Sequence, residues 1–152
     1  GALLEECRRL AKKLGVDEQV HFLGFRKDIQ SLLSITDVSV ASSLREGLPV
    51  NIMEAMAAGI PIVASDNRGH RELVQNEKTG FVIPPSNHME FAKRVIELAQ
   101  LDHKRLQMGM EGIKRMKTYS QSQVTKELAT IYKRYMLEDS YDTKSQYHRT
   151  YI

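Results

Sequence analysis

The chain has 152 residues, of which 41% are hydrophobic, so it can bury one sizeable core and is most simply a single domain. Its formal charge of +3 is spread along the sequence, which favours solvated helix faces over a surface for anionic ligands or a membrane. Residues 139–152 have few basic residues, so we expect no nucleic-acid patch there. The single cysteine, Cys7, excludes an intramolecular disulfide, and no apolar run approaches the ~20 residues that cross a bilayer. No His, Cys or carboxylate cluster has metal-ligand spacing, and no phosphate-binding lysine loop or Ser–His–Asp grouping stands out, so we expect neither a bound metal nor a hydrolase.

Helical and extended patterns alternate along the first hundred residues. In chain order, the patterns predict helices at 2–14, 28–34, 49–58, 71–75, 87–100, 102–117 and 121–138, and strands at 19–23, 37–41, 60–64 and 80–83. Residues 139–152 are polar with interspersed aromatics, and we interpret them as a tail that follows a domain of residues 1–138.

This alternation predicts an α/β fold with a doubly wound, mostly parallel, Rossmann-like sheet and C-terminal helices. The apolar run at 60–64 is typical of a strand that is buried on both faces. Ligands of such sheets bind at the carboxyl ends of the strands, so four loops are expected to line the site: 24–27, 42–48, 65–70 and 84–86.

Two histidines and one polar loop have competing interpretations. His21 lies among apolar residues of an expected strand, which favours a core histidine, whereas His70 is a secondary candidate at the ligand edge. Residues 65–71 follow a buried strand; Arg68 and Arg71 are candidates to touch a phosphate there, but a solvated loop is the favoured interpretation.

The segment EGLPVNIMEAMAAG, residues 46–59, is the most informative in the chain. Pro49 is tolerated in the first turn of a helix, and Gly59 is placed to end it. The first N–H groups of a helix have no internal partner and lie at the positive end of its dipole, so they form a natural seat for phosphate. Carboxylates on both sides of such a seat suit a ligand with phosphate and hydroxyl groups, and a nucleotide sugar fits that description.

Glu46 and Glu54, separated by seven residues, each allow two interpretations. Glu46 precedes the helix, where it either faces sugar hydroxyls and developing positive charge or merely complements the dipole. Glu54 lies among apolar residues of the helix; it is either partly buried with polar partners or an exposed helical glutamate.

The same residues carry a resemblance to a known family. SLREGLPVNIMEAMAAGIPIVASD, followed by RELV, NEKTGFVIPP and a closing helical region, resembles the C-terminal domain of a family-4 retaining glycosyltransferase of the GT-B fold. The upstream HFLGF and TDVSVASS segments match the strands that precede this motif in the family, so the resemblance covers about residues 1–135. DNRGHRELV further resembles bacterial members that build exopolysaccharide or capsule.

The resemblance implies that the domain binds a nucleotide-diphosphate sugar, linked to UDP or GDP, without a metal or other cofactor. By this resemblance Glu46 would contact the donor sugar hydroxyls near the reacting carbon, as the catalytic side chain. The backbone of Gly47 and Leu48 would also meet the sugar.

Further donor contacts are implied along the helix and before it. The N–H groups of Val50 and Asn51 would bind the diphosphate, Glu54 would hold the ribose hydroxyls, and backbone around Arg26 would meet the base. The helix dipole and side chains would offset the charge of the leaving diphosphate.

The chain departs from the family pattern at its N-terminal side. It begins after the second strand of the donor domain, so we expect an incomplete sheet that lacks the basic Arg/Lys pair and the acceptor domain of the parent chain. Arg26, Arg45 and Arg68 are candidates to replace that charge. The acceptor would be a glycan or lipid-linked molecule, the location cytoplasmic, and any attachment to the inner face of the membrane would come through the missing part.

Two rival functions stay open at this point. One is a non-catalytic module that binds or senses nucleotide sugars, and the other is a different GT-B enzyme, such as a sugar-nucleotide epimerase or a phosphorylase. The glutamate pair around Gly47, Leu48 and Pro49 favours the transferase. Because transfer needs the donor and acceptor to be held together, we expect the 152-residue piece to be inactive by itself.

Overall fold

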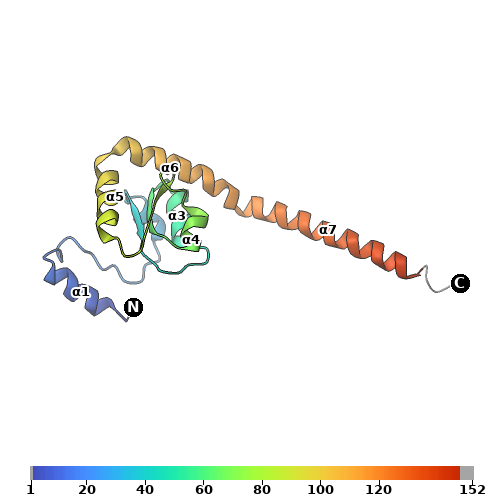
Figure 1. Ribbon diagram of the computed structural model, residues 1–152, viewed down its shortest axis with the longest axis horizontal. Helices are drawn as coiled ribbons and strands as arrows, with labels where there is room; N and C mark the ends of the chain where they lie inside the picture. Colours follow the sequence, from blue (N-terminus) through green and yellow to red (C-terminus); the bar gives the residue numbers. More distant parts are fainter. Residues whose placement is uncertain (1, 148–152) are drawn as a thin grey trace. The chain divides into compact units, whose positions relative to one another are not determined.

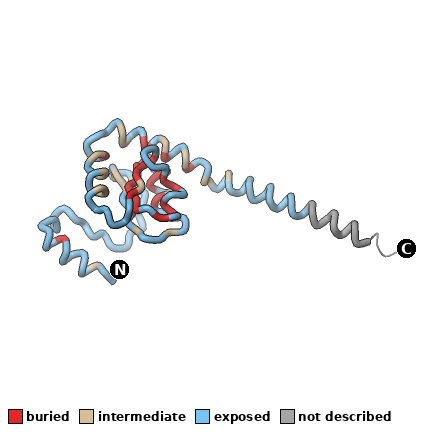
Figure 2. The backbone as a smooth tube through the Cα atoms, in the orientation of Figure 1, coloured by how far each residue is buried: buried red, intermediate tan, exposed pale blue. Residues whose placement is uncertain are grey.

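The computed structural model describes the backbone of residues 2–147 and the side chains of residues 2–136. It divides into two compact units, Gly1–Leu32 and Leu33–Ile152, and each is described by itself. The second unit contains the sheet and most of the buried residues (Figure 2).

The first unit contains α1 (Leu4–Lys13), which ends where Gly15 adopts a positive φ of 68°. The predicted strand at 19–23 is wrong: these residues are irregular and exposed, and His21 is not a core side chain. Apolar and β-branched composition alone does not make a strand, because a strand requires a hydrogen-bonding neighbour, and this segment has none among the described residues. The short helix α2 (Ile29–Leu33) follows.

The second unit is built on a parallel sheet of three strands in the order β1-β2-β3. They are β1 (Ser39–Ala41), β2 (Ile62–Ser65) and β3 (Gly80–Ile83). Val63 of β2 pairs in register with Val40 of β1 and Phe81 of β3. The predicted α/β class with a parallel sheet is therefore confirmed.

Helices cover both faces of this sheet (Figure 1). The crossover helices α3 (Val50–Ala57) and α4 (Arg68–Leu73) pack together, with α3 against β1 and β2, while α5 (His88–Gln100) packs against β2 and β3. All four residues of β2 are buried, as predicted for the apolar run. Alternate side chains enter two separate cores, since Ile62 and Ala64 pack with residues of α3 and Val63 packs with Phe81 and Leu98.

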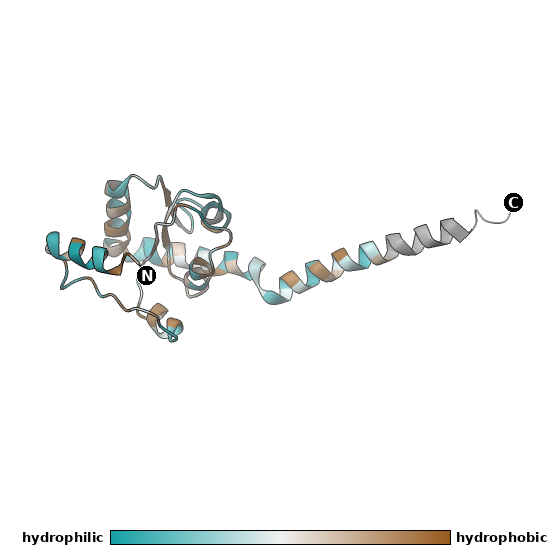
Figure 3. Ribbon diagram, turned by 90° about the horizontal axis from the view of Figure 1, so that it is seen from below, coloured by the Kyte–Doolittle hydropathy of each residue, from teal (hydrophilic) through white to brown (hydrophobic). Residues whose placement is uncertain are grey.

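Three helical segments complete the chain: α6 (Asp102–Met116), a 3-10 turn (Lys117–Tyr119) and α7 (Gln121–Tyr147). α7 continues beyond the predicted end at 138, so the expected tail is helical as far as Tyr147, and residues 148–152 lie outside the described residues. Hydrophobic and hydrophilic residues are mixed along the coloured part of α7, whereas the strands are hydrophobic (Figure 3). Within residues 2–147, no helix is long and apolar enough to cross a membrane.

Candidate functional site

Three of the four predicted loops meet at one edge of the sheet. Because β1, β2 and β3 are parallel, the segments after them leave from the same edge, and these are residues 42–48, 65–70 and 84–86. The backbone N–H of Asp66 donates to the carbonyl oxygen of Ile83 over 2.7 Å, which joins the second of these loops to the end of β3. The fourth predicted loop, 24–27, belongs to the first unit.

The N-terminus of α3 opens at this edge. Pro49 is its N-cap residue, with extended backbone (φ −73°, ψ 110°), and no side chain caps the helix. The first intrahelical bond runs from the Met53 N–H to the Pro49 carbonyl over 3.2 Å. The N–H groups of Val50 and Asn51 come before this first donor and have no acceptor inside the helix. They point out of its N-terminal end, and no side chain caps them. The helix ends before Gly59, whose φ of +78° confirms the predicted stop.

The two glutamates of the motif are available to a ligand. Glu46 is half-buried in the loop before α3, and Gly47 and Leu48 beside it are exposed. Glu54 is exposed on α3, which decides between the two interpretations of its environment. It lies one turn after Val50, about 6 Å further along the axis. Within residues 2–136, neither carboxylate has a hydrogen bond or ion pair.

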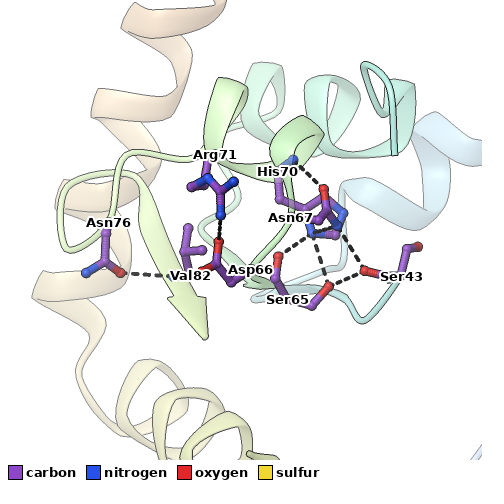
Figure 4. Close-up of polar contacts among 8 residues, drawn as sticks. All are labelled: Ser43, Ser65, Asp66, Asn67, His70, Arg71, Asn76 and Val82. Carbon is purple, nitrogen blue, oxygen red and sulfur yellow. Dashed lines mark hydrogen bonds and ion pairs between the residues drawn. The ribbon is translucent and has the colours of Figure 1, made fainter. Parts of the chain in front are cut away.

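A buried polar cluster supports this edge (Figure 4). The carbonyl oxygen of Ser43 accepts hydrogen bonds from Ser65 Oγ and from Asn67 Nδ2, the latter over 2.9 Å. Asn67 Oδ1 accepts from the backbone N–H of His70 over 3.0 Å and so caps α4. His70 Nδ1 lies 2.7 Å from the carbonyl oxygen of Ser65. The prediction of a solvated loop is therefore wrong for Ser65, Asn67 and His70, which are buried and bind neighbouring backbone. It holds for the exposed side chains of Asp66, Arg68 and Arg71.

Gly69 brings the backbone of α4 against the loop that carries Glu46. A Cβ atom on Gly69 would lie 2.5 Å from the carbonyl oxygen of Gly47 and 2.7 Å from that of Glu46, closer than atoms can approach. Sequence reasoning did not single out Ser43, Asn67 or Gly69. The signals that point to them are an N-cap asparagine three residues before His70 and a glycine inside a helix.

Basic side chains near the motif differ in whether they are already paired. Arg71 forms an ion pair with Asp66, while Arg45 and Arg68 are exposed and, in the part of the chain with described side chains, have no ion pair. In the first unit, Arg26 Nε donates to Asp28 Oδ1 over 2.8 Å, and this guanidinium lowers the pKa of the Asp28 carboxyl.

A cavity of about 250 Å³ lies elsewhere in the second unit. Its lining residues are Glu77, Lys78, Lys104, Gln107, Met108 and Glu111. The two lysines are already paired, Lys78 with Glu111 at 3.4 Å and Lys104 with Glu97. None of its residues belongs to the three loops, so the open edge in front of α3 is the better candidate for a site.

Comparison with known proteins identifies the family of the chain. The profile of the family described as "Glycosyl transferases group 1" matches residues 1–115. EpsD of Bacillus subtilis (strain 168), which is assigned as a glycosyltransferase, is 41% identical over 140 residues, or 92% of this chain and 37% of its own. An N,N'-diacetylbacillosaminyl-diphospho-undecaprenol alpha-1,3-N-acetylgalactosaminyltransferase of Campylobacter jejuni subsp. jejuni serotype O:2 is 30% identical over 115 residues, 76% of this chain and 31% of its own.

A solved structure shares the fold of the chain. The crystal structure of Anabaena Alr3699/HepE in complex with UDP superposes with a TM-score of 0.75 and 26% identity, covering 84% of this chain and 36% of that one. The chain thus spans about a third of the length of these relatives. The family profile matches residues 1–115, and the chain has the parallel α/β fold of GT-B glycosyltransferases. The chain therefore belongs to the group 1 glycosyl transferases.

Proposed function

We propose that this chain is the donor-binding part of a retaining glycosyltransferase. The enzyme would move a sugar from a nucleotide-diphosphate sugar to a glycan or lipid-linked acceptor, in the biosynthesis of a bacterial polysaccharide. The observation that carries the proposal is the open N-terminus of α3, which has no side-chain cap, with an unpaired carboxylate on each side of it.

The reacting end of the donor would lie at the loop before α3. Glu46 faces the sugar near the carbon that is transferred, where a carboxylate stabilises the positive charge that develops as the diphosphate leaves. The backbone of Gly47 and Leu48, both exposed, contacts the sugar hydroxyls. Because Glu46 has no internal partner among the described residues, its charge is free to act on a ligand.

The nucleotide end would extend along α3. The N–H groups of Val50 and Asn51 bind the diphosphate, Glu54 accepts hydrogen bonds from the ribose hydroxyls, and backbone at Arg26 contacts the base. The helix dipole and a basic side chain, Arg45 or Arg68, offset the negative charge without a metal ion.

The relatives support the class of donor and acceptor. Alr3699/HepE was crystallised with UDP and with UDP-glucose, which favours a uridine nucleotide over a guanosine one. The Campylobacter enzyme is named for a diphospho-undecaprenol substrate, which supports a lipid-linked acceptor.

Calorimetry tests the donor site in the full-length parent protein that contains this chain, with UDP, GDP and their sugar conjugates as ligands. A carboxylate that accepts two ribose hydroxyls contributes about 1.5–3 kcal/mol, so Glu54→Ala should weaken UDP binding by about 10- to 100-fold. Glu46→Gln should leave UDP affinity unchanged and lower the rate of transfer by about 100-fold or more. Glu127→Ala, a matched exposed glutamate on α7, should change neither. If Glu54→Ala bound UDP as tightly as the parent protein, the ribose assignment would be wrong.

A further inference from the structure

The loop that carries Glu46, residues 42–48, is called the Glu46 loop. Two side chains, one from the end of β2 and one from the N-cap of α4, hold its backbone at one point. Ser65 Oγ and Asn67 Nδ2 both donate to the same carbonyl oxygen, that of Ser43, just beyond the end of β1 (Figure 4). A carbonyl oxygen has two lone pairs, so these two donors fill its hydrogen-bonding capacity. The loop therefore leaves the sheet in a direction that the next strand determines.

The two donors are themselves fixed in orientation. Ser65 is fully buried and Asn67 is 8% exposed, so their bonds lie in a medium of low dielectric constant, where they are strong and costly to break. Asn67 Oδ1 is engaged by the His70 N–H at 3.0 Å, which leaves the amide nitrogen turned toward Ser43. The side chain thus has one end on α4 and the other on the loop.

His70 completes the cluster from inside the protein. Its ring is fully buried, Nδ1 lies 2.7 Å from the Ser65 carbonyl oxygen, and Nε2 has no partner. A buried N–H without an acceptor is less tolerable than an unpaired lone pair, so we assign the proton to Nδ1, which donates to Ser65. This bond fixes the end of β2, from which the Ser65 hydroxyl reaches the loop.

A second contact holds the loop beyond Ser43. The backbone of Gly69 lies against the carbonyl groups of Glu46 and Gly47, with no room for a Cβ atom. The loop is thus supported at both ends of residues 43–47, and Glu46 is a part of the second contact.

We infer that Asn67 and Ser65 are positioning residues, which hold the backbone of loop 43–48 and so orient the Glu46 carboxylate toward the donor sugar. They act through the Ser43 carbonyl oxygen and touch no substrate themselves. The inference rests on the proposed function for its effect on transfer, but the mechanical part, the support of the loop by two side chains, can be measured without activity.

Asn67→Ser separates the two tasks of Asn67. Serine is as good an N-cap as asparagine, so α4 keeps its cap, while the amide donor to Ser43 is lost and no charge is buried. Asn87→Ser is the matched control, because Asn87 Oδ1 caps α5 through the Glu90 N–H at 3.1 Å and its side chain has no hydrogen bond to the Glu46 loop among the described residues. Ser65→Ala removes the other donor and leaves the fold of β2 unchanged.

Backbone ¹⁵N relaxation of the 152-residue chain is the first measurement, because it reports the order of a loop whose amides donate no hydrogen bonds within the described residues. Asn67→Ser and Ser65→Ala should each lower the order parameters of residues 44–48 from about 0.85 toward about 0.6, while the order parameters of β2 stay unchanged and Asn87→Ser changes nothing in that loop. Unchanged order parameters in residues 44–48 for both variants would overturn the inference.

Kinetics of the full natural chain are the second measurement. Asn67→Ser should lower kcat by about tenfold with the Kd for UDP unchanged, since a displaced Glu46 loop affects the sugar end and not α3. If Glu46→Gln abolished transfer and Asn67→Ser did not reduce it, the positioning role would be refuted and the proposed function would stand. If the parent protein bound no nucleotide, the proposed function would fail, and the order parameters of residues 44–48 would still decide whether the loop is held.

Discussion

At the scale of single residues, buried or half-buried polar side chains in this domain bind backbone groups of another segment. Asn67 is one case, and Arg115 is another: its Nε donates to the Leu73 carbonyl over 2.7 Å and its Nη2 to the Glu72 carbonyl. These are terminal carbonyls of α4, which lack partners inside the helix. The Tyr119 hydroxyl also donates to Glu72, and burial, followed by that hydrogen bond, raises the pKa of Tyr119. α4 is thus capped by side chains at both ends.

Arg115→Met tests the C-terminal cap. It retains the apolar stem but loses two charge-assisted hydrogen bonds, so the free energy of unfolding should fall by about 1–2 kcal/mol, less than for fully buried bonds because one of them is exposed. Lys114→Met, next to it, removes an exposed side chain whose ion pair with Glu111 is long, 3.8 Å, and should change stability by less than about 0.5 kcal/mol. Urea unfolding of both variants makes the comparison. If both variants lost the same free energy of unfolding, the hydrogen bonds of Arg115 to α4 would make no specific contribution to stability.

At the scale of elements, α6 approaches α3 through glycines. A Cβ atom on Gly109 would lie 2.0 Å from the Gly59 carbonyl oxygen, whereas one on Gly112 would lie 3.4 Å from the Met56 carbonyl oxygen. The first position therefore permits no side chain, and the second has ordinary contact distances. Gly59 itself follows α3, so the close approach of α6 braces the C-terminal end of the helix whose other end faces the site.

Two alanine substitutions on α6 should have opposite effects. Gly109→Ala forces the helices apart and should destabilise the domain by about 1–3 kcal/mol or more. Gly112→Ala gains helix propensity, up to about 1 kcal/mol, and should be neutral or stabilising. Thermal unfolding monitored by circular dichroism distinguishes them. A stable Gly109→Ala variant would contradict the packing described for α3 and α6.

A cluster of charges joins α5 and α6 over β3. Arg94 and Lys104 lie over the ring of Phe81, at 4.5 and 5.0 Å from its centroid, and both bind the carboxylate of Glu97. The hydrogen bond from Lys104 is the largest cause that lowers the pKa of Glu97 from its ordinary value of 4.5; burial opposes it and Arg94 adds to it. Ion pairing with Glu97 likewise raises the pKa of Arg94.

The lowered pKa of Glu97 predicts how stability depends on pH. Because the folded pKa lies below the unfolded one, the contribution of Glu97 is fully present above the ordinary value of 4.5 and is lost as the pH falls through the folded pKa. Glu97→Gln should therefore destabilise the domain at pH 7, and the difference from the parent protein should shrink progressively in acid. Urea unfolding at pH 7 and at successively lower pH measures this, with Glu127→Gln on α7 as the control. A constant difference across this range would exclude the ion pairs as the cause.

At the scale of the whole molecule, the chain spans only about a third of the length of its relatives. Transfer requires the acceptor to be held against the donor, and this proximity is a large part of the catalysis. We therefore expect the 152-residue chain to show no transfer in a radiolabelled-sugar assay, with UDP binding that is weak or absent. Measurable glycosyl transfer by the purified chain would refute this expectation.

Sequence predicted the local features better than the contacts between segments. β3 was predicted with its observed bounds because Gly80 and Pro84 bracket it. The helix predicted at 87–100 starts where the N-cap Asn87 precedes α5, because capping is a local interaction. The strand at 19–23 was wrong because pairing depends on a neighbour, which composition does not reveal. The Asn67 cluster was missed for the same reason: its partner Ser43 lies 24 residues away in the sequence. Roles assigned to Glu46 and Glu54 stay predictions, although the structure leaves both side chains available.

The support of the Glu46 loop has a consequence for the evolution and engineering of this enzyme class. Ser65, Asn67 and Gly69 all contact main-chain carbonyl groups, which every amino acid carries, and none of these contacts depends on the side chains of the loop. Leu44 and Leu48 are 78% and 48% exposed. Positions 44 and 48 are therefore suitable for a saturation library that alters donor preference, since the scaffold that orients Glu46 would persist across the variants.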